Sequence, residues 1–312
     1  MRIEGLGVSG LEAALVTDRG SVREVNEDGA VIEAWPDKSA VLLVVADGMG
    51  GQFGGGVASQ LVVETFRTLL GQPVPATLFE RYERLLGCFY KADEAIKRRA
   101  SEDLGLMSMA STAIAAIISP TECLHLYAGD CRMYHFVDGS TPYVTRDHSV
   151  VSVLVETGLV ALEEVSDHPM RSVVTSSLGA GRSSRLNVDP KWRDAANEQP
   201  AVRSVSPRDV LLFCTDGLSC EVSLDGLTSL VAQHRSDPDA LVRACLDAAL
   251  AKGARDNITV AVVQVTGLST GASEAVTSPD ALDRNIEYRD PTVASAVSQQ
   301  LVTPIVSDKD AE

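Results

Sequence analysis

The chain has 312 residues, which is enough for one large domain or two small ones with a full hydrophobic core. Its formal net charge is -16 and its pI is about 4.7. A surface this acidic repels nucleic acid and anionic membranes, so neither is an expected partner. No apolar run reaches the roughly 18 residues that span a bilayer. The N-terminus does not resemble a signal peptide, which favours a cytoplasmic location.

The six cysteines do not form a zinc-binding pattern, because none lies in a C-x-x-C pair. Several lie inside apolar runs, as Cys214 does within residues 211–215. We therefore expect buried, reduced thiols of the kind found in cytosolic proteins.

The first half of the chain predicts strands around a pair of helices. A short strand region leads to the turn-forming residues 17–20, and the apolar run 41–46 predicts a strand buried on both faces. Apolar residues then recur at helical spacing over 57–69 and again over about 79–100. Strands are expected at 112–118, 123–128 and 132–137. Asp138-Gly139 suits a hairpin turn from the last of these to 142–145.

The second half continues with an irregular stretch, 148–186, that contains a helical piece near 149–157. The sequence then predicts a buried strand at 210–215, a helix at 239–252 and a strand at 258–265. Residues 267–312 are rich in Ser, Thr, Ala and Asp without apolar periodicity, and we expect a flexible tail. Strands in series around one helical pair predict an α+β domain built on antiparallel sheets.

Acidic residues stand at the ends of several predicted strands. Each of Asp47, Asp130 and Asp216 follows an apolar run, Asp256 precedes one, and Glu27-Asp28 forms a further pair. A carboxylate at the end of a buried strand is partly desolvated, and an unpaired charge there is costly. Several such ends brought together would repel one another unless cations bridged them. Mg²⁺ and Mn²⁺ bind carboxylates without needing His or Cys.

Taken singly, each acidic position has a simpler explanation. An Asp-Gly pair after a strand is more often a plain turn, and Asp256-Asn257 is a common loop dipeptide. The turn interpretation becomes weaker when it must account for all the positions in their order along the chain.

That ordered set resembles the metal-dependent protein phosphatases of the PPM family, also called PP2C-like phosphatases. The resemblance extends over roughly 17–265. The matching segments are TDRGSVREVNED (17–28), VVADGMGG (44–51), AGDCR (128–132), TRDHSVV (145–151), LLFCTDGL (211–218) and RDNITV (255–260).

The resemblance implies a role for each matching residue. Asp47 would bridge two cations, Mn²⁺ or Mg²⁺. Glu27 and the Gly48 carbonyl would serve one of them, and Asp216 and Asp256 the other. The remaining roles are as follows: Asp28 would act through water, Arg23 would bind the substrate phosphate, and Asp130 would help to bind a third, weaker cation, as in bacterial members.

The resemblance also implies a fold and a reaction. The fold would be two antiparallel β-sheets packed as a central sandwich with helices outside each, in four αββα layers. Residues 1–266 would form the phosphatase domain, with 148–186 as a flap-like region. A metal-activated water would hydrolyse phosphoserine or phosphothreonine on proteins, without a phospho-enzyme. The expected partners are phosphorylated proteins, including a bacterial Ser/Thr kinase and its substrates.

The sequence departs from the family pattern at several positions. Met49 stands where many eukaryotic relatives have a His, Cys131 replaces the usual Ser, and residues 110–112 read Ala-Ser-Thr instead of Gly-Thr-Thr. His148, after Asp147, is compatible with proton transfer or with a structural hydrogen bond, and the structural role is favoured.

Two other functions were weighed against this one. A cysteine-dependent phosphatase needs Cys and Arg six positions apart, and no cysteine here has that spacing. The alternative is a catalytically inactive interaction module that keeps the fold without the metals.

Overall fold

The computed structural model describes residues 6–50, 54–161, 164–165, 168–181, 186–192 and 200–267. Their contacts group them into one compact unit within Met1–Ser269. The predicted tail lies outside the described residues from position 268 onward, as do parts of the flap-like region 148–186.

Ten strands form two five-stranded sheets, and every pairing between neighbouring strands is antiparallel. The first sheet has the order β1-β10-β9-β6-β7 and comprises Leu11–Asp18, Ile258–Val265, Val210–Cys214, Arg132–Phe136 and Tyr143–Val144. The second has the order β2-β3-β4-β5-β8 and comprises Gly29–Ala34, Val41–Met49, Ala110–Ile118, Glu122–Ala128 and Val202–Ser204.

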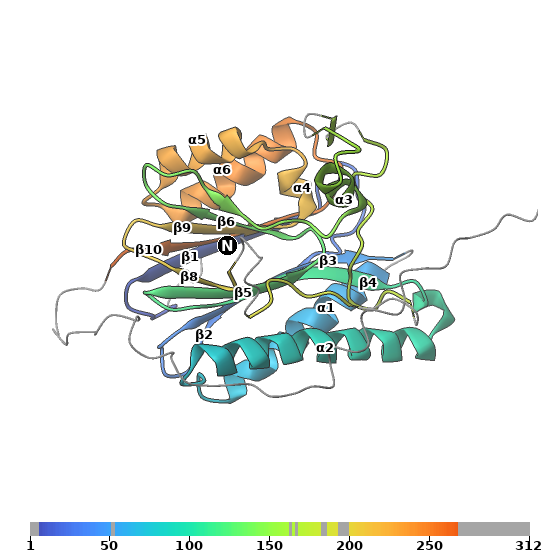
Figure 1. The fold of residues 1–312 in the computed structure, drawn as a ribbon, viewed down its shortest axis with the longest axis horizontal. Coiled ribbons are helices and arrows are strands. Elements are labelled where there is room, and N and C mark those ends of the chain that lie inside the picture. The colour runs from blue at the N-terminus through green and yellow to red at the C-terminus, as the bar shows by residue number, and fades with distance from the viewer. Residues whose placement is uncertain are drawn as a thin grey trace, which may run out of the picture. The chain divides into compact units, whose positions relative to one another are not determined.

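Helices cover the outer face of each sheet, so the unit has four layers (Figure 1). Helices α1 (Gly54–Arg67) and α2 (Leu78–Glu102) contact the second sheet, and α5 (Leu224–His234) with α6 (Pro238–Ala251) covers the first. The shorter elements are α3 (Val150–Glu156), α4 (Asp216–Ser219) and the 3₁₀ turns Thr68–Gly71 and Leu104–Leu106. The predicted αββα sandwich is confirmed. None of the described helices is both long enough and apolar enough to cross a membrane.

Alternation of side chains along each central strand explains why the strands read as continuous apolar runs. On β3, Leu43 and Val45 point into the core between the sheets, whereas Leu42 and Val44 point toward the helices. A strand with a period of two and both faces buried needs an apolar residue at every position.

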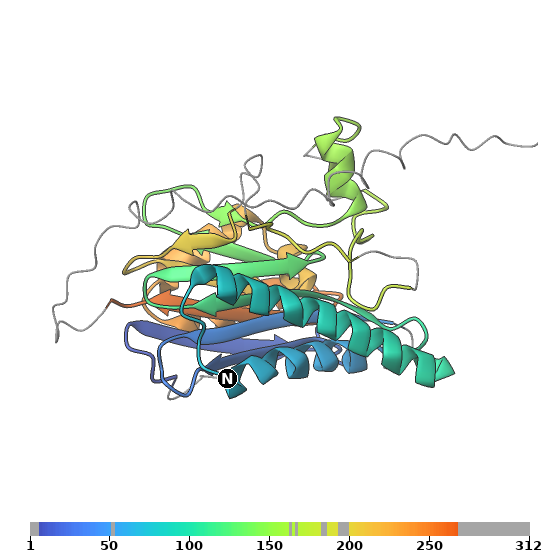
Figure 2. The same ribbon diagram turned by 60° about the horizontal axis from the view of Figure 1, so that its bottom comes forward.

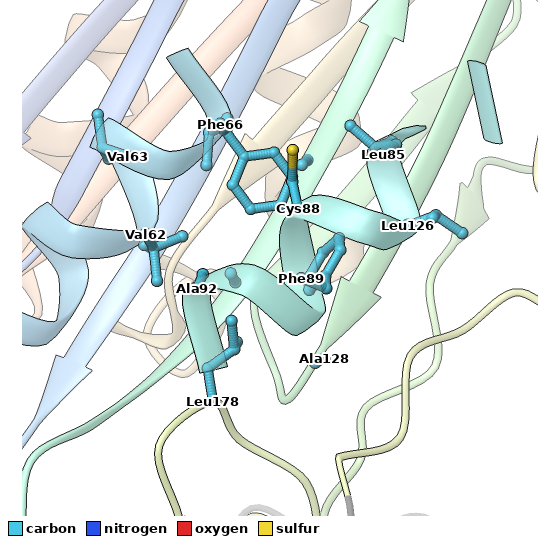
Figure 3. Packing of buried hydrophobic residues seen from close by; sticks show 14 of the residues in the cluster. Val62, Val63, Phe66, Leu85, Cys88, Phe89, Ala92, Leu126, Ala128 and Leu178 are labelled. Carbon is cyan, nitrogen blue, oxygen red and sulfur yellow. The ribbon is translucent and has the colours of Figure 1, made fainter. Parts of the chain in front are cut away.

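The helical layer against the second sheet is closed by interlocking aromatic and aliphatic side chains (Figure 3). Phe66 of α1 meets Phe89 of α2 edge to face, with ring centroids 5.0 Å apart. A capping box between Thr77 and Glu80 begins α2 and satisfies backbone N–H groups that the helix leaves free. Figure 2 shows α2 lying along the sandwich, while α3 stands away from the sheets at one end.

Several elements differ from the sequence-based expectation. The strand predicted at 41–46 continues to Met49, so Asp47 lies inside β3 and not beyond its end. Strands β2 and β8 and helix α5 were not predicted. Pairing with a neighbouring strand overrides weak local propensity in the two short strands. The hairpin at Asp138-Gly139 is confirmed by the pairing of β6 with β7.

Truncating Leu43 to alanine tests the core between the sheets. Leu43 is fully buried, and a buried Leu→Ala change removes apolar contacts and leaves a cavity. We expect the free energy of unfolding to fall by about 2–5 kcal/mol, measured by urea denaturation. Leu104→Ala is the matched control, because Leu104 is 87% exposed, and its change should stay within about 0.5 kcal/mol. Equal effects of the two variants would contradict this assignment of the core.

Candidate active site

A set of polar side chains occupies one end of the space between the two sheets. Leu43 and Val45 point between the sheets, so the alternation directs Asp47, two residues further along β3, the same way. Asp47 pairs in register with Thr112 of β4. The same alternation directs three threonines into this space: Thr17 of β1, Thr215 directly after β9 and Thr259 of β10.

Two of these threonines hold the Asp28 carboxylate. Thr215 donates from Oγ1 to Asp28 Oδ2 over 3.0 Å, and Thr259 donates to the same oxygen over 2.7 Å. The Thr17 hydroxyl lies 2.9 Å from that of Thr259 and extends the network to β1. Residues 259 and 28 are far apart in sequence, and this contact brings both ends of the domain to the site.

The loop that carries Arg23 and Glu27 is held by Asn257. The Asn257 side chain donates to the backbone carbonyls of Arg19 and Val25, each over 3.0 Å, and accepts from the Glu27 N–H over 2.8 Å. One buried amide therefore fixes three points of an otherwise irregular loop. Sequence reasoning treated Asn257 only as part of a loop dipeptide.

Close backbone approach places Glu27 beside the end of β3. A Cβ added at Gly48 would lie 2.1 Å from the Gly55 carbonyl oxygen and 2.5 Å from the Glu27 carbonyl oxygen. One added at Gly55 would lie 2.9 Å from the Glu27 carboxyl carbon. Only glycine fits at these two positions. Ser59 donates to the Glu27 carbonyl over 2.6 Å, and Gly56 N–H donates to its carboxylate over 3.3 Å.

Arg23 and Asp256 form an ion pair at the open side of the site. Arg23 Nη2 lies 2.8 Å from Asp256 Oδ2, and the two side chains are 52% and 40% exposed. The charges of Asp256, and more weakly those of Asp47 and Glu27, raise the pKa of Arg23, which shows that the guanidinium lies within the field of the acidic residues.

Crowding of the carboxyl groups strongly perturbs their protonation. Burial, followed by the charge of Asp28, Asp216 and Asp130, raises the pKa of Asp47 well above its usual value. Burial is also the main cause that raises the pKa of Asp28 and of Asp130 to about 7. For Asp216 burial and then the charge of Asp256 raise the pKa to about 6. Nearby like charges in a dry site are unfavourable unless a cation or a proton compensates them.

The donors at this site match those that hard divalent cations prefer. They are carboxylate oxygens, and Asp216 Oδ1 is buried with no hydrogen-bond partner. As the side chains stand, no three His, Cys, Asp or Glu residues in the described ranges could together hold a metal ion. The carboxylates of Glu27, Asp28 and Asp256 have hydrogen-bond or ionic partners here, but a carboxylate offers about four acceptor sites, so these partners do not exclude a cation. In chemical type, the donor set fits Mn²⁺ or Mg²⁺.

A cavity of about 570 Å³ adjoins the acidic cluster on the side of α3 and α4. Asp130 and Asp216 line it together with Arg171, Cys220 and Val151. Of the six free cysteines, Cys220 is exposed and the other five are buried. The expectation of buried thiols is therefore wrong for Cys220, because α4 presents it to this cavity.

The structure brings all the predicted acidic positions and Arg23 into one electrostatic cluster. Gly48 joins them through its contact with Glu27. Sequence reasoning missed Thr215, Thr259 and Ser59. The two threonines did carry a signal, because each is a polar residue at an inward position of an apolar strand.

A cluster of carboxyl groups lies between two antiparallel sheets, with an arginine at its rim, and the comparisons identify the family. The model of the protein phosphatase 2C family matches residues 20–259, and the chain belongs to this family. It is 30% identical over 258 residues to a protein phosphatase 2C-type protein of Streptococcus pyogenes, covering 81% of this chain and 97% of that protein.

Solved structures give the same result. The crystal structure of the Mycobacterium tuberculosis serine/threonine phosphatase PstP/Ppp is similar with a TM-score of 0.71 and 28% identity, covering 82% of this chain and 99% of that one. The PstP catalytic domain in complex with two manganese ions is similar with a TM-score of 0.68 and 27% identity, over 82% and 99% of the two chains.

Removing one carboxylate should stabilise the protein when chelator is present. The folded-state pKa of Asp47 lies above its unfolded value, so this group destabilises the fold increasingly as pH rises above about 4. In EDTA we expect Asp47→Asn to raise the melting temperature at pH 7.5 by at least about 2 °C, roughly 1 kcal/mol, with less gain at pH 4.5. Differential scanning calorimetry measures both.

Asp37→Asn is the control, because Asp37 lies in the exposed turn at the opposite end of the same β2–β3 hairpin. That variant should not gain stability between pH 4.5 and 7.5. A gain for Asp47→Asn that does not depend on pH would contradict the electrostatic origin of the effect.

Proposed function

We propose that this phosphatase hydrolyses phosphoserine and phosphothreonine on proteins with two divalent cations, Mn²⁺ or Mg²⁺, bound at the acidic cluster. The observation that carries the proposal is the group of buried carboxyl groups that raise one another's pKa beside the unpartnered oxygen of Asp216. Such a cluster is unfavourable by itself and becomes favourable when cations are bound.

The residues divide the work by position. Asp47, at the centre of the cluster, would bridge the two cations. Glu27 and the Gly48 carbonyl would hold one, and Asp216 and Asp256 the other. Bound cations would supply Lewis acidity toward the phosphoryl group and would lower the pKa of water. Asp28, which two threonines hold, would act through water. Asp130 would help to bind a third, weaker cation.

Arg23 would bind the substrate phosphate. Its guanidinium carries five N–H donors in a planar fork, and among the described residues Nη2 donates to Asp256 while the other donors have no hydrogen-bond partner. The remaining donors can meet two phosphoryl oxygens at once and offset the charge that accumulates on them during hydrolysis. Met49 beside the site has no proton to give, so we propose that water or a metal-bound water protonates the leaving oxygen.

Further parts of the proposal concern the whole chain. Residues 1–266 would act as the catalytic domain, with 148–186 as a flap-like region within it, and 267–312 would form a C-terminal tail. Phosphorylated proteins are the substrates of this class, and we propose a cognate Ser/Thr kinase and its targets among them. Six free cysteines support a reducing, cytoplasmic location. The net charge of -16 disfavours nucleic acid and anionic membranes as partners.

Loss of the central ligand and loss of the phosphate-binding arginine should affect different kinetic parameters. With p-nitrophenyl phosphate and saturating Mn²⁺, we expect Asp47→Asn to lower kcat at least about 100-fold, because even outer partners of metal ligands contribute 10–100-fold. Arg23→Ala should raise KM and the inhibition constant of inorganic phosphate about 10- to 100-fold. This range corresponds to the loss of one hydrogen bond to a charged group, about 1.5–3 kcal/mol. Steady-state kinetics separate the two effects.

Asp37→Asn should keep wild-type activity, and EDTA should abolish the activity of every active form. Turnover that persists in EDTA would contradict a metal-dependent reaction. A well-folded wild type that neither binds Mn²⁺ nor turns over substrate would favour the alternative, an inactive interaction module.

The depth of the site predicts which phosphorylated side chain it accepts. Arg23 and Asp256 are about half exposed, so a phosphate on a short serine or threonine side chain can reach them, whereas a deep site would favour phosphotyrosine. We expect kcat/KM for phosphoserine and phosphothreonine peptides to exceed that for the matching phosphotyrosine peptide by at least about tenfold, or about 1.4 kcal/mol. Phosphate release from peptides that differ only at that residue measures it, and equal rates would contradict it.

A further inference from the structure

His148 is the first residue of the flap-like region 148–186, and it contacts both the loop that carries Asp130 and Thr175 further along that region. The His148 N–H donates to the Gly129 carbonyl over 2.9 Å, and the Gly129 N–H donates to His148 Nδ1 over 3.3 Å. The residue immediately before Asp130 is thus held by the backbone and the side chain of one histidine.

Asp189 determines which ring nitrogen of His148 carries the proton. Asp189 Oδ2 lies 2.9 Å from His148 Nε2 and also accepts from the Asn187 side chain over 2.8 Å. Burial opposes ionisation of Asp189, but the hydrogen bond from His148 and the charge of Lys191 outweigh it and lower its pKa to about 2. An ionised Asp189 needs a donor at Nε2, so Nδ1 is left as the acceptor for Gly129.

Asp189 is itself fixed to the sheet. Its backbone N–H and carbonyl pair with those of Tyr127 on β5, at 2.9 and 2.7 Å. The Tyr127 ring packs on the His148 ring with centroids 4.9 Å apart. The imidazole is therefore held at its face by β5 and at its edge by Asp189.

The other side of the Asp130 loop is held by the residue next to His148. Asp147 accepts two hydrogen bonds from Arg132, at 2.8 and 2.6 Å. Gly129 has a φ of +107°, and a Cβ at that position would lie 2.3 Å from Thr112 Cβ. The loop therefore has little room, and its two ends are fixed by two consecutive residues.

The same histidine connects this loop to the flap-like region. Thr175 N–H donates to the His148 carbonyl over 2.7 Å, and Val150 N–H donates to the Val173 carbonyl over 2.8 Å. The two ends of the segment that contains α3 are thereby joined beside the Asp130 loop. A displacement of this segment would pull on the residue that supports Gly129.

We propose that His148, oriented by Asp189, is a positioning residue that holds the Asp130 carboxylate in place for its cation and couples it to the flap-like region. The inference rests on the proposed function, because it assigns Asp130 to a cation. His148 touches neither substrate nor metal in this arrangement and acts through the Gly129–Asp130 peptide unit.

Three variants separate the contacts of the imidazole. His148→Ala removes both side-chain hydrogen bonds. His148→Asn keeps an oxygen near the position of Nδ1, so Gly129 retains an acceptor. Asp189→Asn leaves the histidine in place but removes the charge that selects its tautomer. His234→Ala, at the end of α5, is the control for loss of a histidine elsewhere.

The first measurement is Mn²⁺ binding to the full chain by isothermal titration calorimetry, without substrate. We expect His148→Ala to weaken the weakest class of Mn²⁺ sites by at least about tenfold, in the range known for outer-shell partners. The tighter sites should stay within about threefold. His148→Asn should stay within about threefold at all sites, and Asp189→Asn should fall between the two.

The second measurement is amide hydrogen exchange of the 129–132 segment by mass spectrometry in EDTA, which does not depend on catalysis. His148→Ala should lose protection there, whereas His148→Asn and His234→Ala should keep it. If His148→Ala does not fold, Asp189→Asn alone should show loss of protection and weaker binding.

The proposal is overturned if His148→Ala, or Asp189→Asn in its place, leaves the weakest Mn²⁺ site and the exchange unchanged. It is equally overturned if every Mn²⁺ site weakens together, because the effect would then be global. A wild type that binds no Mn²⁺ would instead refute the proposed function, so the two failures can be told apart.

Discussion

Repulsion among buried carboxyl groups is the constraint on which this structure depends. Asp28, Asp47, Asp130 and Asp216 meet where water is scarce, and burial together with mutual charge raises the pKa of each. A fold maintains such an arrangement only when other interactions hold the groups there and a positive charge compensates them. We propose that divalent cations supply that charge, which would tie the electrostatics of the site to the chemistry of its family.

The β-sandwich supplies the force that holds the carboxyl groups together. Continuous apolar strands, buried on both faces, give each sheet a core toward the helices and share a third core between the sheets. Where that inner core ends, the alternation of side chains continues with polar residues from both sheets. Hydrogen bonds from Thr215 and Thr259 to Asp28, and the three contacts of Asn257, then fix loops that have no regular structure of their own.

The open side of the cluster has a different character from the inner side. Arg23 and Asp256 are about half exposed, whereas the cavity toward α3 is lined by both charged and aliphatic side chains. The loop of Asp130 lies between these two regions and is held by Asp147 and His148. The part of the site nearest the flap-like region thus depends most on contacts outside the acidic cluster.

The sequence by itself determined the buried strands and the two long helices that contact the second sheet, because apolar periodicity is a local signal. It also marked the acidic positions, because their order along the chain resembles the family pattern. Tertiary structure alone decided that Asp47 lies inside β3, that short strands such as Gly29–Ala34 exist, and that Asn257 holds the loop of Glu27. The physical reason is that strand pairing and side-chain hydrogen bonds join residues of different segments: Asp47 pairs with Thr112, and Asn257 meets Glu27 across 230 positions. No local pattern records which partner such a residue will meet.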